Sequence, residues 1–321
     1  MKKIVISEFM DASAVDKLRA DFDVQYDPSL VDVPEALRQA LADAHALIVR
    51  NRTQVSSALL DGAPNLLAVG RLGVGLDNID LDACAGRGVT VHPATGANAQ
   101  AVAEYVIASA LLLLRGVYFA SKDVTDGRWP RTALSNGREL AGATLAVIGF
   151  GGIGQLVARL ARGLGMRVVG HDPQLPPDAP CWRETGAHPV SLDDALRCAD
   201  VVTLHVPLLP ATRNLLDSAR FAMLKKGAVV INTARGGIVD EVALAAALRS
   251  GHVAGAALDV FADEPLAAAS RLAGTPNLIL TPHIAGLTLQ SNERVSSLVA
   301  ARIKAALCSA ELALTEKEGG G

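Results

Sequence analysis

Residues 144–172, TLAVIGFGGIGQLVARLARGLGMRVVGHD, carry the strongest structural signal in the chain. The apolar run Leu145–Ile148 leads into Gly149, Gly151 and Gly154, and a helical pattern and a second apolar run follow. In a G-x-G-x-x-G turn the first glycine permits the tight bend, the second lets a pyrophosphate approach, and the third lets helix and strand pack closely. The stretch therefore predicts a dinucleotide-binding unit with the phosphates at the helix N-terminus.

The acid at the end of this stretch indicates which dinucleotide binds. Asp172 stands where dinucleotide sites have the carboxylate that binds the ribose hydroxyls. A 2′-phosphate would be repelled there and would need a basic residue nearby, but residues 173–180 contain none. The sequence favours NAD over NADP. The alternative is a chance cluster in a chain with 29 glycines, but the strand, the helix and the acid all stand in register with the motif.

The composition excludes several classes of protein. Half of the 321 residues are apolar and the net charge is only −3, so no global charge favours nucleic acid. The longest apolar stretch, residues 106–114, is much shorter than the roughly 20 residues that cross a bilayer. The four cysteines form no C-x-x-C pair, which predicts neither a metal site nor a disulfide framework and favours the cytoplasm.

Short apolar runs alternate with helical patterns along the whole chain. Such alternation predicts parallel sheets covered by helices on both faces. Strands are expected at residues 3–7, 24–26, 46–50, 67–70, 89–92, 145–148, 200–205, 228–232, 255–259 and 278–280. Helices are expected at residues 14–20, 34–42, 56–60, 81–86, 192–197, 219–224, 241–250 and about 289–310, with Asp80 as an N-cap. Residues 117–142 are expected to form a loop.

This order predicts an α/β protein with two Rossmann-like or flavodoxin-like parallel-sheet domains separated by a cleft. Residues 1–97 and 290–321 are expected to form the substrate-binding domain, and residues 98–289 the NAD-binding domain. The helix expected at Asn98–Gly116 is apolar nearly all round, so we expect it to be buried between domains or in a subunit interface. The tail Glu316–Gly321 is expected to be disordered or to be a cloning remnant.

Three polar side chains follow strands of the second domain, where open α/β sheets bind their ligands. They are Arg235 in INTARGGIVDE, Glu264 in LDVFADEP and His283 in LTPHIAG. A neutral imidazole can take a hydroxyl proton while a hydride leaves the same carbon, and a carboxylate can fix its tautomer. A guanidinium can grip a substrate carboxylate at two points. All three residue types are also common on ordinary loops, and their spacing does not show that they meet.

The ordered motifs GFGGIG, HDP, LHVPLLPATRNLL, NTARGGIVDE, ALDVFADEP and TPHIAG resemble the D-isomer-specific 2-hydroxyacid dehydrogenase family. LGVGLDNID and GANAQAVAEYV also match, so the resemblance extends from about residue 46 to residue 302. It implies hydride transfer between NAD and C2 of a small D-configured 2-hydroxy acid, with no metal. It further implies that His283 is the acid/base, that Glu264 is its partner, and that Arg235 orients the substrate.

The resemblance also implies the NAD contacts. The pyrophosphate would lie at the glycine turn, the adenosine near the loop after strand 200–205, and the carboxamide at Asp259. The implied NAD set is Gly149, Gly151, Gly152, Ile153, Gly154, Asp172, Val206, Pro207, Thr233, Ala234, Arg235, Asp259, His283 and Gly286. The backbone of Gly73, Val74 and Gly75 would bind the substrate carboxylate, beside Arg235 and His283. Similar family members are usually homodimers joined through the helix that corresponds to residues 98–116.

Three arginines of the first domain bear on the choice of substrate. Arg50, Arg52 and Arg71 lie in IVRNRTQV and GRLGVG, near loops expected to face the substrate. Arg50 and Arg52 share a face only if the strand continues through Asn51. Arg235 and backbone N–H groups are enough to bind a single carboxylate, so further arginines suggest that the substrate carries a second anionic group. The alternative is that one or two of them are solvated surface charges.

Two doubly anionic three-carbon substrates fit this expectation. They are (S)-3-sulfolactate with 3-sulfopyruvate, and 3-phosphoglycerate with 3-phosphohydroxypyruvate. The stretches ISEFMD, VRNRTQV and HIAGLTLQSNERVS resemble sulfolactate dehydrogenases of the family at least as much as phosphoglycerate dehydrogenases. Two alternatives are a glyoxylate/hydroxypyruvate reductase activity and an NAD(H)-sensing, corepressor-like interaction protein, although the chain shows no resemblance to an added peptide-binding segment.

Overall fold

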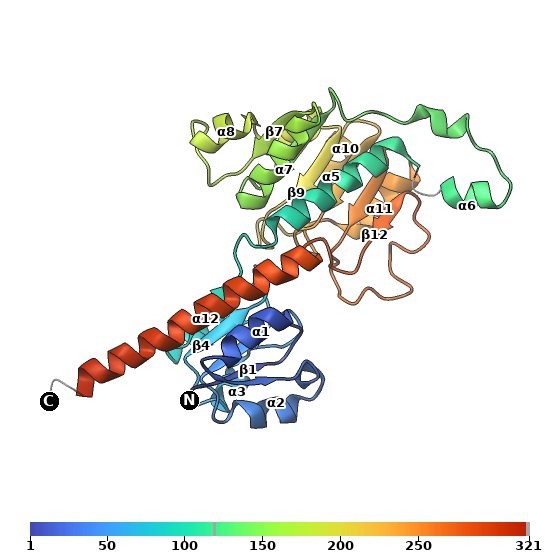
Figure 1. Ribbon diagram of the computed structural model, residues 1–321. Coiled ribbons are helices and arrows are strands. Elements are labelled where there is room, and N and C mark those ends of the chain that lie inside the picture. The colour runs from blue at the N-terminus through green and yellow to red at the C-terminus, as the bar shows by residue number, and fades with distance from the viewer. Residues whose placement is uncertain (118–119, 319–321) are drawn as a thin grey trace. The chain divides into compact units, whose positions relative to one another are not determined.

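The computed structural model describes the backbone of residues 1–117 and 120–318 and the side chains up to residue 309 (Figure 1). The chain divides into two compact units, Met1–Asn98 with Leu287–Gly321, and Ala99–Gly286. Both units are built on parallel sheets, so the predicted α/β fold class is confirmed. No helix in the described ranges is long and apolar enough to cross a membrane.

The first unit has a five-stranded parallel sheet in the order β2-β1-β3-β4-β5. Its strands are β1 (Lys3–Ile6), β2 (Asp23–Tyr26), β3 (Ala46–Val49), β4 (Ala68–Arg71) and β5 (Thr90–Pro93). The connecting helices are α1 (Ala12–Arg19), the 3-10 turn η1 (Leu30–Asp32), α2 (Pro34–Leu41), α3 (Ser57–Asp61) and α4 (Leu81–Gly86). Asp80 caps α4 through a bond from the Ala83 N–H, as predicted.

The last helix, α12 (Leu289–Glu318), returns to this sheet and packs against α1, β4 and β5. A Cβ at Gly70 of β4 would stand 2.6 Å from Val299 of α12, so only glycine allows this close approach. Successive residues of a strand point to opposite faces, which puts Ile4 and Ile6 under α12 and Val5 in the cluster beneath α2 and α3. Both faces of the sheet are therefore buried.

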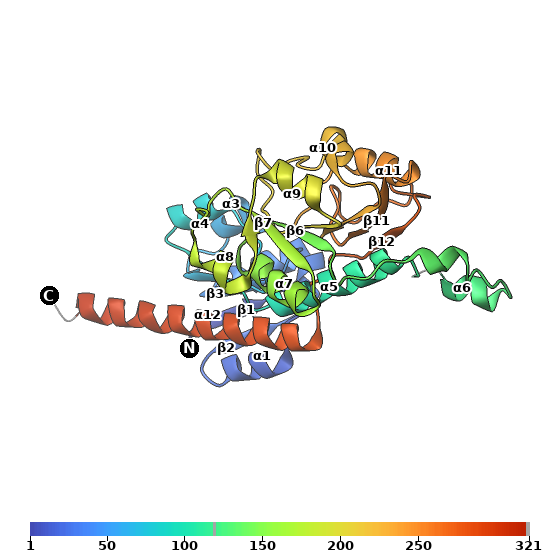
Figure 2. The same cartoon turned by 90° about the horizontal axis from the view of Figure 1, so that it is seen from above.

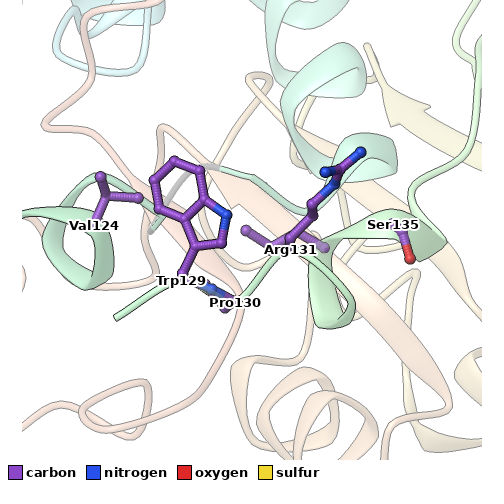
Figure 3. Close-up of a pocket in the computed structure, with 6 residues that line it drawn as sticks. Val124, Trp129, Pro130, Arg131 and Ser135 are labelled. Atoms are coloured by element: carbon purple, nitrogen blue, oxygen red, sulfur yellow. The ribbon is translucent and has the colours of Figure 1, made fainter. Parts of the chain in front are cut away.

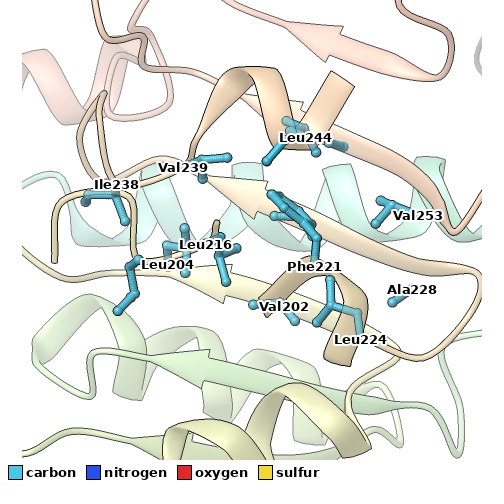
Figure 4. Close-up of a cluster of buried hydrophobic side chains, with 14 of the residues drawn as sticks. Val202, Leu204, Leu216, Phe221, Leu224, Ala228, Ile238, Val239, Leu244 and Val253 are labelled. Carbon is cyan, nitrogen blue, oxygen red and sulfur yellow. The ribbon is translucent and has the colours of Figure 1, made fainter. Parts of the chain in front are cut away.

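The second unit has a seven-stranded parallel sheet in the order β12-β11-β10-β9-β6-β7-β8. Its strands are β6 (Thr144–Ile148), β7 (Arg167–His171), β8 (His188–Pro189), β9 (Val201–Leu204), β10 (Ala228–Asn232), β11 (Val253–Leu258) and β12 (Leu278–Leu280). Its helices are α5 (Ala99–Arg115), α6 (Ala120–Thr125), η2 (Ala133–Asn136), α7 (Gly152–Gly163), α8 (Pro180–Thr185), α9 (Leu192–Cys198), α10 (Ser218–Met223) and α11 (Glu241–Arg249). Figure 4 shows one of its two buried clusters, in which Val202, Leu204 and Phe221 pack between the sheet and helices α10 and α11.

Each sheet has one place where the strand order reverses. In the first unit it lies between β1 and β3, and in the second between β6 and β9. Open parallel sheets bind ligands outside the carboxyl ends of the strands at such a point, because the connections there leave in opposite directions. The glycine turn follows β6, so the second switch point coincides with the predicted dinucleotide site.

Several expectations about single elements need correction. Residues 117–142 contain α6 and η2 in their described part, and α8 and β8 were not expected. α12 continues through Glu318, so disorder from Glu316 is wrong for the first three residues of the tail, and residues 319–321 lie outside the described ranges. In the single chain Leu111 and Leu112 of α5 are 43% and 42% exposed, so the expected burial of this helix in a subunit interface stays a prediction.

Candidate active site

The predicted catalytic residues follow three neighbouring strands of the second sheet. β10 leads to Arg235, β11 to Glu264 and β12 to His283. Because these strands are parallel and adjacent, their carboxyl ends lie at one edge of the sheet. The His283 Nδ1 lies 2.9 Å from Glu264 Oε2, so the structure brings together two side chains 19 residues apart in sequence.

This contact sets the state of the imidazole. An ionised carboxylate only accepts hydrogen bonds, so Nδ1 of His283 carries the hydrogen and donates it to Glu264. In the neutral ring the lone pair then lies on Nε2, which can accept a proton from a substrate hydroxyl. The second carboxylate oxygen, Glu264 Oε1, accepts from the Phe261 N–H at 3.0 Å, which fixes the carboxylate to its own turn.

The turn that carries His283 is wrapped around a buried carboxylate. His283 has φ 56, a left-handed conformation that non-glycine residues seldom adopt. The next two N–H groups, of Ile284 and Ala285, donate to Asp259 at 2.8 Å each. Asp259 is 1% exposed, and these charge-assisted bonds offset the cost of its burial. The backbone at His283 is therefore held by its surroundings, as is common at functional sites.

The Arg235 turn is fixed by a buried asparagine that the sequence analysis did not single out. Asn232 donates from Nδ2 to the Arg235 carbonyl at 2.9 Å and accepts from the Ala234 N–H at 3.0 Å. A Cβ at Gly236 would collide with the carbonyl of Phe261, so only glycine permits the Arg235 turn to lie against the turn that carries Glu264. The strand-end rule that selected Arg235 applies equally to Asn232.

The glycine turn after β6 fits a dinucleotide. Gly149 has φ 92, and a Cβ there would lie 2.5 Å from the His205 carbonyl. A Cβ at Gly154 would collide with the Gly149 carbonyl, so helix α7 can pack this closely only with glycine. By contrast, a Cβ at Gly151 or Gly152 would meet no atom within 4 Å. The space over the N-terminus of α7 is therefore open to an anionic group such as a pyrophosphate.

Two polar groups near this turn also match the predicted NAD contacts. Asp172, just after β7, accepts from the Phe150 N–H at 2.8 Å and from the Gln174 N–H at 2.9 Å. Each oxygen keeps acceptor capacity for a ribose hydroxyl. The hydroxyl of Thr233, after β10, is buried and is without a hydrogen-bond partner among the described residues. Buried polar atoms without partners are rare, and a bound cofactor would account for this one.

At the switch point of the first sheet, a buried glutamate organises the loop after β3. Glu8 accepts from the backbone N–H groups of residues 50, 51, 52 and 53 at 2.8 to 3.3 Å. Burial alone would raise the pKa of Glu8, but these bonds outweigh it and the net pKa is lowered. The backbone donors of this loop are thus already taken by the protein's own carboxylate. Glu8 follows β1 directly, so the strand-end rule could have identified it.

The loop turns Arg50 and Arg52 to different environments, because β3 ends at Val49 rather than continuing through Asn51. Arg50 is partly buried, donates to Asn292 Oδ1 at 2.7 Å and lies 5.7 Å from the centroid of the Phe9 ring. Burial lowers its pKa and Glu8 opposes this, but the guanidinium has no salt-bridge partner within the described residues. Arg52 is paired with Asp32 at the surface.

The remaining first-unit candidates follow β4. The Arg71 Nη1 donates to the Leu72 carbonyl at 3.0 Å, and the guanidinium lies against the Cα of Gly73, where a Cβ would displace it. Val74 is 36% exposed and Gly75 is also on the surface of this loop. Within the described residues, no group of three or more His, Cys, Asp or Glu side chains could hold a metal ion.

Known proteins resemble both the second unit and the chain as a whole. Residues 107–285 match the family model described as D-isomer specific 2-hydroxyacid dehydrogenase, NAD binding domain. The chain is 52% identical to an (S)-sulfolactate dehydrogenase of Chromohalobacter salexigens, over 96% of this chain and 99% of that protein. It is 42% identical to D-3-phosphoglycerate dehydrogenase 2 of Arabidopsis thaliana over 95% of its own length, but it spans only 48% of that longer protein. A Thermus thermophilus protein of known structure superposes with a TM-score of 0.86 at 34% identity, over 96% of this chain and 97% of that one.

Proposed function

This chain belongs to the D-isomer-specific 2-hydroxyacid dehydrogenase family, and we propose that it interconverts (S)-3-sulfolactate and 3-sulfopyruvate with NAD. The family is shown by the match over residues 107–285, whose description also confirms the predicted cofactor, and by the sulfolactate dehydrogenase relative. The observation that supports a doubly anionic substrate is Arg50 at the switch point of the first sheet, a partly buried guanidinium that forms no salt bridge within the described residues.

The geometry of the second unit supports the proposed catalytic roles. When bound, NAD supplies the acceptor for the hydride that leaves C2. His283 takes the proton of the C2 hydroxyl at Nε2, while Glu264 on Nδ1 stabilises the imidazolium that forms. In the reverse direction the same nitrogen protonates the carbonyl oxygen. Arg235 holds the substrate carboxylate or carbonyl in a planar grip, on a turn that Asn232 keeps rigid.

We propose that Arg50 binds the second anionic group. The backbone donors of its loop are occupied by Glu8 and Arg52 is paired with Asp32, whereas Arg50 forms no salt bridge within the described residues and can bind an anion. Asn292 and the face of Phe9 hold the guanidinium in place without neutralising it. 3-Phosphoglycerate carries the same two kinds of anion and is the second candidate, supported by the 42% identity to a phosphoglycerate dehydrogenase.

The substrate is tested by NADH formation with (S)-3-sulfolactate, 3-phosphoglycerate, D-glycerate and D-lactate. We expect kcat/KM for sulfolactate to exceed that for lactate roughly 10- to 100-fold, the value of one charge-assisted hydrogen-bonded contact. Arg50→Met should remove most of this preference while leaving lactate turnover nearly unchanged. Equal turnover of lactate and both dianions by the natural protein would overturn the proposed substrate class.

The same substitution at Arg52 tests whether Arg50 or Arg52 binds the substrate. Arg52 is 59% exposed and paired with Asp32, and exposed pairs contribute little. Arg52→Met is therefore expected to keep kcat/KM for sulfolactate within about fivefold, since such pairs are worth less than about 1 kcal/mol. A larger loss in Arg52→Met than in Arg50→Met would show that the wrong arginine has been assigned to the substrate.

We also propose that the protein is a homodimer joined through the region of α5. Leu111 and Leu112 of α5 are exposed, and so are Val124 and Trp129, the latter at 77%. Figure 3 shows Val124 and Trp129 at a shallow hollow that Pro130 and Arg131 also line. Large apolar side chains that are exposed in the single chain are typical of surfaces that bind another protein. None of the hollow's lining residues belongs to the predicted active site.

The dimer is tested by molar mass from light scattering. Leu111→Glu/Leu112→Glu should shift the protein to a monomer, because two charges would be buried without partners in the interface. Val242→Glu is a comparable change on another helix, α11, where Val242 is 50% exposed. A dimer that persists in the α5 variant, or one that dissociates equally in Val242→Glu, would argue against this interface.

We further propose a cytoplasmic location. All four cysteines are free thiols, and Cys181, Cys198 and Cys308 are accessible to solvent at least in part. Proteins of oxidising compartments commonly pair such residues, whereas a reducing compartment keeps them free.

A further inference from the structure

Hydroxyl groups connect helix α5 to the carboxylate beneath the His283 turn. The hydroxyl of Tyr105, on α5, lies 2.6 Å from Thr281 Oγ1. Thr281 Oγ1 in turn lies 2.6 Å from Asp259 Oδ1. The first two members of this relay, Tyr105 and Thr281, are separated by 176 residues in the chain. All three residues belong to the second unit.

The direction of the bonds follows from what each group can donate. An ionised carboxylate has no hydrogen, so Thr281 donates its only hydroxyl hydrogen to Asp259. Thr281 Oγ1 can then only accept from Tyr105, whose phenol must be protonated. Burial, opposed by hydrogen bonds with Thr281 and Ser109 and reinforced by the charge of Asp259, raises the pKa of Tyr105, so the phenol keeps its hydrogen at neutral pH.

Asp259 is the point at which this relay acts on the catalytic turn. Its Oδ1 accepts from Thr281 and from the Ile284 N–H, and its Oδ2 accepts from the Ala285 N–H. A carboxylate has about four acceptor sites, so Oδ2 keeps one for a further donor. The orientation of the carboxylate plane decides whether both N–H bonds can form, and those bonds hold the left-handed backbone of His283.

We propose that Tyr105 is a positioning residue for the reaction, which acts through Thr281 and Asp259 to hold the turn that carries His283. The inference rests on the proposed function, because it assumes that His283 is the proton acceptor. Tyr105 touches neither His283 nor Glu264 among the described contacts. Its contribution is to fix one oxygen of Asp259, so that the other contacts of the carboxylate keep the imidazole aimed at the substrate.

The first measurement is amide hydrogen exchange of the apoprotein, which needs neither substrate nor turnover. Tyr105→Phe removes one oxygen and little volume. We expect the N–H groups of Ile284 and Ala285 to exchange about five to ten times faster, the value of roughly one hydrogen bond. The sheet amides, such as those of β10, should keep their rates. Uniformly faster exchange would indicate general destabilisation and would overturn the positioning role.

The second measurement is steady-state turnover of sulfolactate. Tyr105→Phe should lower kcat about fivefold and leave KM for the substrate nearly unchanged, because a looser turn weakens proton transfer rather than binding. Thr281→Val breaks the same relay, and the double variant should be no worse than the poorer single variant. Thr281→Ser keeps the hydroxyl and should restore kcat. Additive losses, or no rescue by serine, would contradict the relay.

Tyr26→Phe is the matched control. Tyr26 belongs to the first unit, and among the described residues its hydroxyl bonds to the backbone of Met10 at 3.3 and 3.4 Å. It should change neither kcat nor exchange at Ile284. If the natural protein turns over none of the four acids, the proposed function fails, and the exchange data still decide whether Tyr105 holds the turn. If turnover is present but Tyr105→Phe alters neither readout, the inference fails and the proposed function stands.

Discussion

His283→Asn is expected to lower kcat by about 10³-fold while leaving KM for NAD within a few-fold, because general acid–base catalysis contributes about 10²- to 10⁴-fold. Asparagine is the informative replacement, since it tolerates a left-handed backbone such as the φ of 56 at this position. The turn should therefore persist without the imidazole. The measurement is NAD-linked turnover of sulfolactate at saturating concentrations, together with cofactor binding by titration.

Glu264→Gln is the companion variant. Its amide keeps a hydrogen-bonding group near Nδ1 but lacks the charge that stabilises the imidazolium. We expect a smaller loss of kcat than in His283→Asn, because the imidazolium that forms during proton transfer is less stabilised. A kcat equal to that of the natural protein in Glu264→Gln would contradict the role of Glu264, and a near-normal kcat in His283→Asn would contradict the role of His283.

Gly151→Ala is expected to weaken NAD binding at least about tenfold while the protein remains folded, since bringing a methyl group against a pyrophosphate costs more than about 1.4 kcal/mol. The open space around Gly151 and its ordinary backbone angles make the substitution harmless to the free protein. The loss would then report the approach of the cofactor itself. The measurements are NAD affinity by calorimetry and the thermal unfolding midpoint.

Gly163→Ala provides the matched control for this change. Gly163 lies at the end of the same helix, α7, and a Cβ there also meets no atom within 4 Å. It should not alter NAD affinity. Gly149→Ala is a contrasting variant, because its φ of 92 and the nearby His205 carbonyl predict damage to the fold as well. Unchanged NAD affinity in Gly151→Ala would place the pyrophosphate elsewhere.

Much of the second unit could be predicted from local pattern. The glycine spacing, the apolar run before it and Asp172 after it identified the dinucleotide turn, because each requirement is met within 29 consecutive residues. The catalytic candidates followed from one rule, that ligands bind beyond the carboxyl ends of parallel strands. That rule selected Arg235, Glu264 and His283, and it would also have selected Glu8 and Asn232.

The two arginines after β3 show where local pattern fails. Whether Arg50 and Arg52 share a face depends on where the strand ends, and Glu8 ends it by binding four N–H groups of the following loop. Glu8 lies in the loop that follows another strand, β1, so nothing within IVRNRTQV reveals this. The exposed pair of Arg52 with Asp32 likewise depends on the path of a separate loop.

The sequence by itself determined the fold class, the NAD cofactor and the set of residues at the strand ends, since these follow from periodicity and short motifs. Only the tertiary structure decided which of these residues meet. His283 Nδ1 and Glu264 Oε2 lie 2.9 Å apart because the neighbouring strands β11 and β12 end side by side, so that the turns after them can meet. The bond between Tyr105 and Thr281 requires α5 to pack beside a strand-end loop 176 residues away. Such contacts arise from packing between distant segments, which strand and helix periodicity does not encode.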